Sequence, residues 1–163
     1  MDLNTFLEIL QFKPIVFINP LMQIIIVLVL IALTFYIQRN EYEKTGKTYG
    51  RYPWRISTIF SSIYEEIIFR GFILFSLFSF LTPIISVVVS SILFGLWHIK
   101  NHKWQTKEET VHQVVYTGVL FGPIACLLTL WTGTVWLAVI IHYLHNLLVD
   151  TYRKIKLNGR VIS

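Results

Sequence analysis

The sequence has little charge, a single cysteine and no basic segment ahead of its first apolar run. Charged residues make up 14% of the 163 residues, against about a quarter in a typical soluble domain. Cys126 alone excludes a disulfide within the chain and a four-cysteine zinc site. Only Lys13 is basic before the first apolar run, so we expect no cleaved signal peptide. What the chain has instead is 55% hydrophobic residues and a mean hydropathy of +0.62, which indicates one compact membrane domain.

The apolar residues are gathered into long blocks. A helix needs ~20 mostly apolar residues to cross the hydrocarbon core. We therefore predict an all-α fold, a polytopic membrane helical bundle with about five transmembrane helices. The predicted spans cover residues 21–37, 56–81, 84–99, 114–131 and 134–149.

The basic residues alternate from one connection to the next. Twelve of the fourteen lysines and arginines lie in residues 38–55, 100–113 and 150–163. The positive-inside rule places these segments in the cytoplasm and the N-terminus outside, for a multi-pass protein of the cell membrane. The net charge of +5 is explained by this asymmetry and by contact with anionic lipids. No pattern indicates binding to nucleic acid.

Three parts of the chain follow from this arrangement. Residues 1–55 would hold the first transmembrane helix and a cytoplasmic loop, and residues 56–150 a core of four transmembrane helices. Residues 151–163 would form a basic cytoplasmic tail.

Charged side chains interrupt the second apolar block. Its stretch SSIYEEIIFRGF carries Glu65, Glu66 and Arg70. An ionised side chain at the centre of a membrane helix costs ~2.5–3.5 kcal/mol, so such residues indicate a functional site. Glu66 and Arg70 are four residues apart and can pair on one helix face. Glu65 points about 100° away, and we expect it to face a polar cavity.

Polar residues of three predicted spans reach a similar depth. Measured along the helices from the short LTPI turn, Glu65 and His98 lie ~25 and ~22 Å away. His142 and Asn146 lie ~14 and ~20 Å beyond the WTGT turn of the second hairpin, in the same half of the membrane. We therefore predict that the four side chains meet in one cavity that opens to the cytoplasm, with Glu66 beside them.

These residue types can activate water. Glu65 can act as a general base while His98 holds the same water. His142 and Asn146 can donate hydrogen bonds to a developing oxyanion. No nucleophilic side chain accompanies the four, so we expect hydrolysis by water without an acyl-enzyme intermediate.

Three short motifs carry a resemblance to a known family. EEIIFR matches EExxxR, FGLWH matches FxxxH and HYLHN matches HxxxN. In this order, each in its own apolar block, they resemble the CPBP (Abi) family, which comprises type II CAAX prenyl endopeptidases and bacteriocin-processing enzymes. The resemblance covers about residues 56–150, which would form the catalytic core of an intramembrane endopeptidase. It implies that Glu65 and His98 activate the water, that His142 and Asn146 form the oxyanion site, and that Glu66 and Arg70 support them.

The resemblance also implies partners and leaves the cofactor open. Substrates would be CAAX-like, prenylated or bacteriocin peptides, bound beside membrane lipids. The chain is short for the family, so a homo-oligomer is an alternative to a monomer. A glutamate-and-water mechanism needs no catalytic metal. Zinc remains an alternative because His98 and His102 are spaced as in helical zinc sites and His145 is a further ligand, although HIKNH lacks the glutamate of HExxH.

Two functions without catalysis are open as well. A bacteriocin-immunity or scaffold protein could use the polar cluster for folding alone. A small transporter is a third reading, against which stands the absence of related halves. Among the remaining features, Gly118 and Gly122 with nearby serines predict close helix packing, and Pro123 predicts a kink in its helix.

Overall fold

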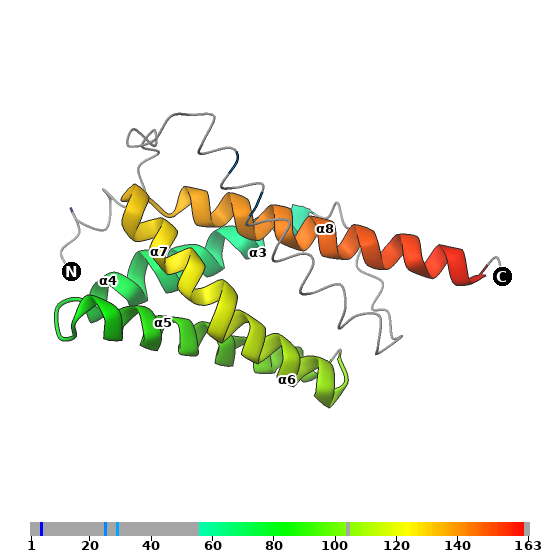
Figure 1. Cartoon of the computed structure of the whole chain (residues 1–163), viewed down its shortest axis with the longest axis horizontal. Helices are drawn as coiled ribbons and strands as arrows, with labels where there is room; N and C mark the ends of the chain where they lie inside the picture. The colour runs from blue at the N-terminus through cyan, green and yellow to red at the C-terminus, as the bar shows by residue number, and fades with distance from the viewer. Residues whose placement is uncertain (1–3, 5–24, 26–28, 30–55, 104, 162–163) are drawn as a thin grey trace.

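The computed structural model describes residues 56–103 and 105–161, together with the isolated positions 4, 25 and 29. The predicted first span at residues 21–37 and the loop that follows it lie outside the described residues, apart from those isolated positions. The described part is all-α, as predicted, and it forms four helical segments (Figure 1).

Each segment except the last is built from several elements that follow one another directly. The first segment is α3 (Ile56–Glu66), the π-helical η1 (Ile67–Ile73) and α4 (Leu74–Leu77). The second is α5 (Pro83–Trp97) with the 3₁₀-helical η2 (His98–Lys103). The third is α6 (Lys107–Val115), the π-helical η3 (Tyr116–Phe121) and α7 (Gly122–Thr132), and the fourth is α8 (Trp136–Val161).

Local chemistry sets where these helices begin and end. The Thr82 hydroxyl accepts a hydrogen bond from the Ile85 amide, and Pro83 occupies the first turn of α5, where its missing N–H costs nothing. Thr106 and Glu109 form a reciprocal capping box at the start of α6. Gly133 ends α7 in the left-handed conformation with φ 66°.

The observed bounds differ from the predicted spans most at two places, besides the end of α4 at Leu77 and the start of α8 at Trp136. The helix predicted to start at residue 114 starts at Lys107, because the capping box stabilises a polar first turn that the hydropathy pattern does not reveal. The last helix continues past residue 150 to Val161, so most of the predicted basic tail extends α8.

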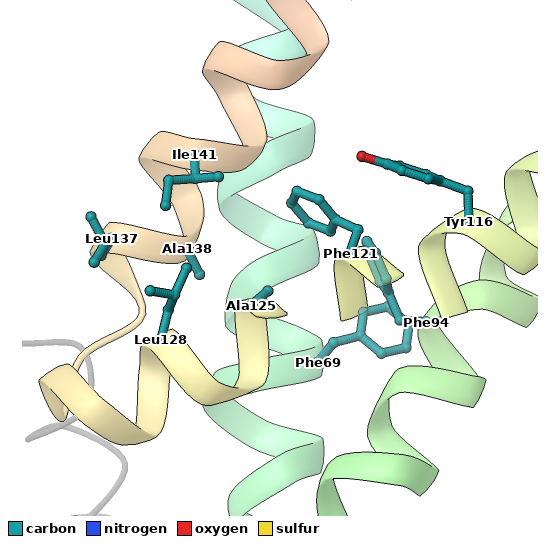
Figure 2. Close-up of a cluster of buried hydrophobic side chains, with 9 residues drawn as sticks. All are labelled: Phe69, Phe94, Tyr116, Phe121, Ala125, Leu128, Leu137, Ala138 and Ile141. Atoms are coloured by element: carbon teal, nitrogen blue, oxygen red, sulfur yellow. The ribbon is translucent and has the colours of Figure 1, made fainter. Parts of the chain in front are cut away.

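The helices pack so that α3 and α7 both contact α8, while α5 contacts η3 and α7 (Figure 1). One buried apolar cluster, drawn in Figure 2, draws on all four segments. Its members are Phe69, Phe94, Tyr116, Phe121, Ala125, Leu128, Leu137, Ala138 and Ile141.

Small residues bring α5 and the third segment into direct contact. A methyl group added to Gly95 would lie 2.7 Å from the Val114 carbonyl oxygen and 2.8 Å from the Gly118 Cα. One added to Gly122 would lie 2.9 Å from the Ser91 Cβ. The predicted close packing of glycines and serines is therefore confirmed, and it draws the two backbones together as in many membrane proteins.

The distribution of side chains is that of a membrane protein. Serines 62, 86, 90 and 91 are buried, whereas Phe72, Phe80 and Val119 are more than half exposed. Among the described residues, two helices are long and apolar enough to cross a membrane, Pro83–His102 and Lys107–Thr132. An apolar exterior around an interior that also buries serines and charged side chains suits a lipid environment, where water does not drive apolar groups inward.

Candidate active site

Glu66 and Arg70 form a fully buried ion pair. Arg70 Nη1 lies 3.1 Å from Glu66 Oε2 and 3.2 Å from Glu66 Oε1. The pairing predicted from their four-residue spacing is therefore present. The other side of Arg70 is equally enclosed, because its Nη2 donates to the Gly122 carbonyl at 3.4 Å and its guanidinium carbon lies 4.0 Å from the centre of the Phe94 ring.

A π-helical turn carries Arg70. The Leu74 amide donates to the Phe69 carbonyl five residues earlier, and the Ser90 hydroxyl donates to the same carbonyl at 2.8 Å. Such a turn fits an extra residue into the helix and is frequent at functional sites. A second π-helical turn, η3, precedes Pro123, which has no backbone N–H to donate. The kink expected at Pro123 stays a prediction.

His142 joins this pair from α8. Its Nδ1 lies 2.7 Å from Glu66 Oε1. A carboxylate only accepts, so Nδ1 carries the proton and donates it. The hydrogen bond leaves the opposite nitrogen, Nε2, to face the rest of the site.

His98 is oriented in the same way at the end of α5. Its Nδ1 lies 2.8 Å from the Phe94 carbonyl oxygen, which can only accept, so Nδ1 donates. The Phe94 ring packs in a T-shaped arrangement against both imidazoles, with its centroid 4.8 Å from that of His98 and 5.9 Å from that of His142. Figure 2 shows Phe94 between Phe69 and Phe121, within the apolar cluster.

Glu65 lies between the two histidines. Its Oε2 is 3.9 Å from His98 Nε2 and 3.9 Å from His142 Nε2. These separations are too long for direct hydrogen bonds and shorter than two hydrogen bonds of ~2.8 Å placed end to end. One water oxygen can therefore bridge Glu65 and a histidine. Three of the four residues predicted to share a cavity are thus brought together.

The second oxygen of Glu65 is held by residues that the sequence analysis did not assign to the site. Oε1 accepts from the Tyr64 hydroxyl at 3.2 Å and from the Trp97 indole N–H at 3.3 Å. Lys100 Nζ lies 3.7 Å from the same oxygen. The sequence offers one signal for this set, since Tyr64 and Trp97 directly precede Glu65 and His98 in the motifs.

Three further residues that the sequence analysis considered for the active site or for a zinc site lie at its edge or outside it. Asn146 is half-buried one turn beyond His142 on α8, on the same helix face. His145 is buried and lies with its Nε2 3.1 Å from the Tyr116 hydroxyl. His102 is exposed, and its Nδ1 bonds to the Ile99 carbonyl of its own turn.

The zinc alternative does not fit these positions. His98 faces Glu65, His145 pairs with Tyr116 and His102 is turned outward. Among the described residues, no group of three or more histidine, cysteine, aspartate or glutamate side chains is arranged to hold a metal ion.

An all-α fold with an apolar exterior and a buried glutamate–histidine cluster defines a helical membrane protein with a polar site in its interior. The family model of the type II CAAX prenyl endopeptidases, Rce1-like, matches residues 51–148. The match covers more than half of the chain, and the chain belongs to this family. All six residues of the predicted site fall within the matched segment. No curated protein and no solved structure matches the chain.

Proposed function

We propose that the protein is an intramembrane endopeptidase that hydrolyses a peptide bond with a water molecule activated by Glu65 and His98. The observation that carries the proposal is the position of Glu65 Oε2, 3.9 Å from the Nε2 atoms of both histidines. Membership of a CAAX endopeptidase family supports the same chemistry.

The hydrogen-bond directions support a specific role for the water. His98 Nδ1 donates to Phe94, so its Nε2 presents a lone pair, as does the Glu65 carboxylate. A water that donates one hydrogen to each acceptor turns its own lone pair toward the substrate carbonyl. As the oxygen attacks, Glu65 takes the proton and later delivers it to the leaving amine.

The opposite side of the site would stabilise the oxyanion. His142 donates through Nδ1 to Glu66, so it donates through Nε2 as well when the ring is doubly protonated. The Asn146 amide, one turn further along α8, is the second donor. Glu66 and Arg70 hold His142 in place and do not take part in the proton transfer.

The substrate class that we propose follows from the family and from the membrane location. We propose a CAAX-like, prenylated or bacteriocin-type peptide that reaches the site from the membrane. The chain would cross the membrane several times with its N-terminus outside and its C-terminus in the cytoplasm, as its basic residues indicate.

Cleavage of a panel of peptides by the protein purified in detergent tests the proposal. The panel holds prenylated and unprenylated forms of the same C-terminal sequences. We expect the wild-type protein to cleave at least one prenylated peptide and Glu65→Gln to lower kcat by about 10³-fold or more, because it removes the base and keeps the shape. Glu108→Gln, an exposed glutamate at the start of α6, is the matched control.

Two results would contradict the proposal. One is a folded wild-type protein that cleaves no member of the panel, which would favour the non-catalytic immunity or scaffold reading. The other is a Glu65→Gln variant that cleaves at the wild-type rate.

A further inference from the structure

The two oxygens of the Glu65 carboxylate have different surroundings, and the two histidines account for only one of them. Three donors from two helical segments converge on Oε1, whereas Oε2 faces the imidazoles. Tyr64 belongs to α3, Trp97 to the last turn of α5 and Lys100 to η2. The three distances, 3.2, 3.3 and 3.7 Å, each join a different residue to this one oxygen.

We infer that Tyr64, Trp97 and Lys100 form an orienting clamp, which fixes the Glu65 carboxylate so that only Oε2 is available to the attacking water. The inference rests on the proposed hydrolysis and adds three positioning residues to it.

Rotation of the carboxylate is the motion that the clamp would prevent. The last torsion of a glutamate side chain is broad and has no sharp staggered minima. A carboxylate oxygen has about two lone-pair directions. With three donors around it, Oε1 has no room for a water, and a water at Glu65 is directed to Oε2, between the histidines.

The three donors also support one another. Lys100 Nζ donates to the Tyr64 hydroxyl at 3.5 Å and lies 3.8 Å from the centre of the Trp97 ring. The ammonium group is thus held by an aromatic face as well as by a carboxylate. A lysine fixed on two sides is better ordered than one in an isolated surface ion pair, which contributes little.

The clamp lies at the outer edge of the site. The Lys100 side chain is 43% exposed and Tyr64 and Trp97 are 40% and 38% exposed, against 9% for the Glu65 side chain. Tyrosine and tryptophan suit this position because each combines an apolar ring with one polar donor. The clamp therefore also covers Oε1 on the outside without closing the Oε2 side.

Substitutions that remove one donor each test the clamp in the cleavage assay. We expect Tyr64→Phe, Trp97→Phe and Lys100→Met each to lower kcat about 10-fold with KM unchanged. The first two remove a hydrogen bond to the Glu65 carboxylate, and the third removes the ion pair of 3.7 Å with the same oxygen. Lys100→Arg should restore kcat to within about twofold of wild type, since the arginine keeps the charge and the ring contact. Tyr143→Phe and Lys107→Met, at positions outside the clamp, are the matched controls.

The kinetic pattern separates positioning from other roles. A rise in KM at constant kcat would assign the three residues to substrate binding and overturn the inference. Retention of kcat within twofold in all three variants would overturn it as well.

A measurement without substrate keeps the clamp testable apart from catalysis. The difference in fluorescence between protein with and without Trp97 isolates the emission of this residue. We expect Glu65→Ala to shift that emission and Glu108→Ala to leave it unchanged, because the indole N–H donates to Glu65. An unchanged Trp97 emission in Glu65→Ala would refute the clamp. A wild-type protein that cleaves nothing but shows the shift would refute the proposed function and leave the clamp standing.

Discussion

Glu66 Oε1 accepts a hydrogen bond of 2.7 Å from Nδ1 of His142, a residue 76 positions later in the chain. The same carboxylate is paired with Arg70 on the following π-helical turn. Glu66 therefore connects its own helical segment to α8. This bond decides which nitrogen of His142 faces Glu65. The two neighbouring glutamates thus have different partners: Glu66 holds His142 and Arg70, whereas Glu65 is the residue to which we assign the attacking water.

The first prediction concerns the buried ion pair. We expect Glu66→Gln to lower the free energy of unfolding by about 3–5 kcal/mol, because the Arg70 charge then stays buried without a carboxylate. Denaturant unfolding of the purified protein in detergent measures the change. Cleavage should fall too, because the single amide oxygen of glutamine can accept from His142 only if the NH2 group is turned toward the Arg70 guanidinium, so the orientation of His142 is weakened.

A second substitution distinguishes the uncompensated charge from a loss of packing. Glu66→Gln combined with Arg70→Met removes both charges and should recover part of the lost stability, though not the activity. A double variant less stable than Glu66→Gln alone would show that the arginine contributes through its packing on Phe94 and its bond to Gly122, and the prediction would be wrong.

The second prediction concerns His98. We expect His98→Gly to lower kcat by about 10²–10⁴-fold, the usual contribution of a positioned acid–base group. Added imidazole should restore part of the rate, because the vacated volume can admit the missing ring beside Glu65. His102→Gly is the control, since this exposed histidine faces away from the site.

The rescue decides the role of His98. Recovery that rises with imidazole concentration and saturates supports a ring that holds the water. If His98→Gly is folded but imidazole restores no activity, His98 contributes only by stabilising the end of α5, and its proposed role of holding the water is wrong.

Spacing within a helix predicted much of this site. Glu66 and Arg70 pair because residues four apart share a face, and this holds in any regular helix. The counted distances from the LTPI turn also placed Glu65 opposite His98, because both residues are measured from the same tight turn and lie at similar distances along their helices. The depth of His142 came from the same arithmetic, and its contact with Glu66 follows from the packing of α3 on α8.

Other features depend on contacts between helical segments, and residue spacing within one helix cannot predict such contacts. The π-helical turn at Arg70 accompanies a bond from Ser90 of another helix to Phe69. The approach of Trp97 and Lys100 to Glu65 depends on the rotation of α5 about its axis, which apolar periodicity leaves open on a helix that is apolar nearly all round. The early start of α6 depends on a capping box inside a polar stretch that hydropathy assigns to a loop.

The third prediction concerns the contact between α5 and the third segment. We expect Gly95→Ala to lower the free energy of unfolding by about 1–3 kcal/mol, the range for overpacking, because the new methyl group would meet the Val114 carbonyl and the Gly118 Cα at 2.7 and 2.8 Å. Both are backbone atoms and cannot rotate away, so α5 must shift. Alanine is the better helix former by about 1 kcal/mol, and this gain opposes the loss only in part.

Gly118→Ala is the matched control for the same interface. A methyl group there would lie 3.5 Å from its nearest neighbours, an ordinary contact, so helix propensity should leave the stability unchanged or raised. Denaturant unfolding of both variants and their cleavage rates measure the difference. Because Gly95 lies one turn before His98, a shift of α5 should also move the imidazole away from Glu65 and lower kcat in Gly95→Ala alone. Equal stability and equal kcat in the two variants would show that the helices can separate at no cost, and that this contact does not hold the site together.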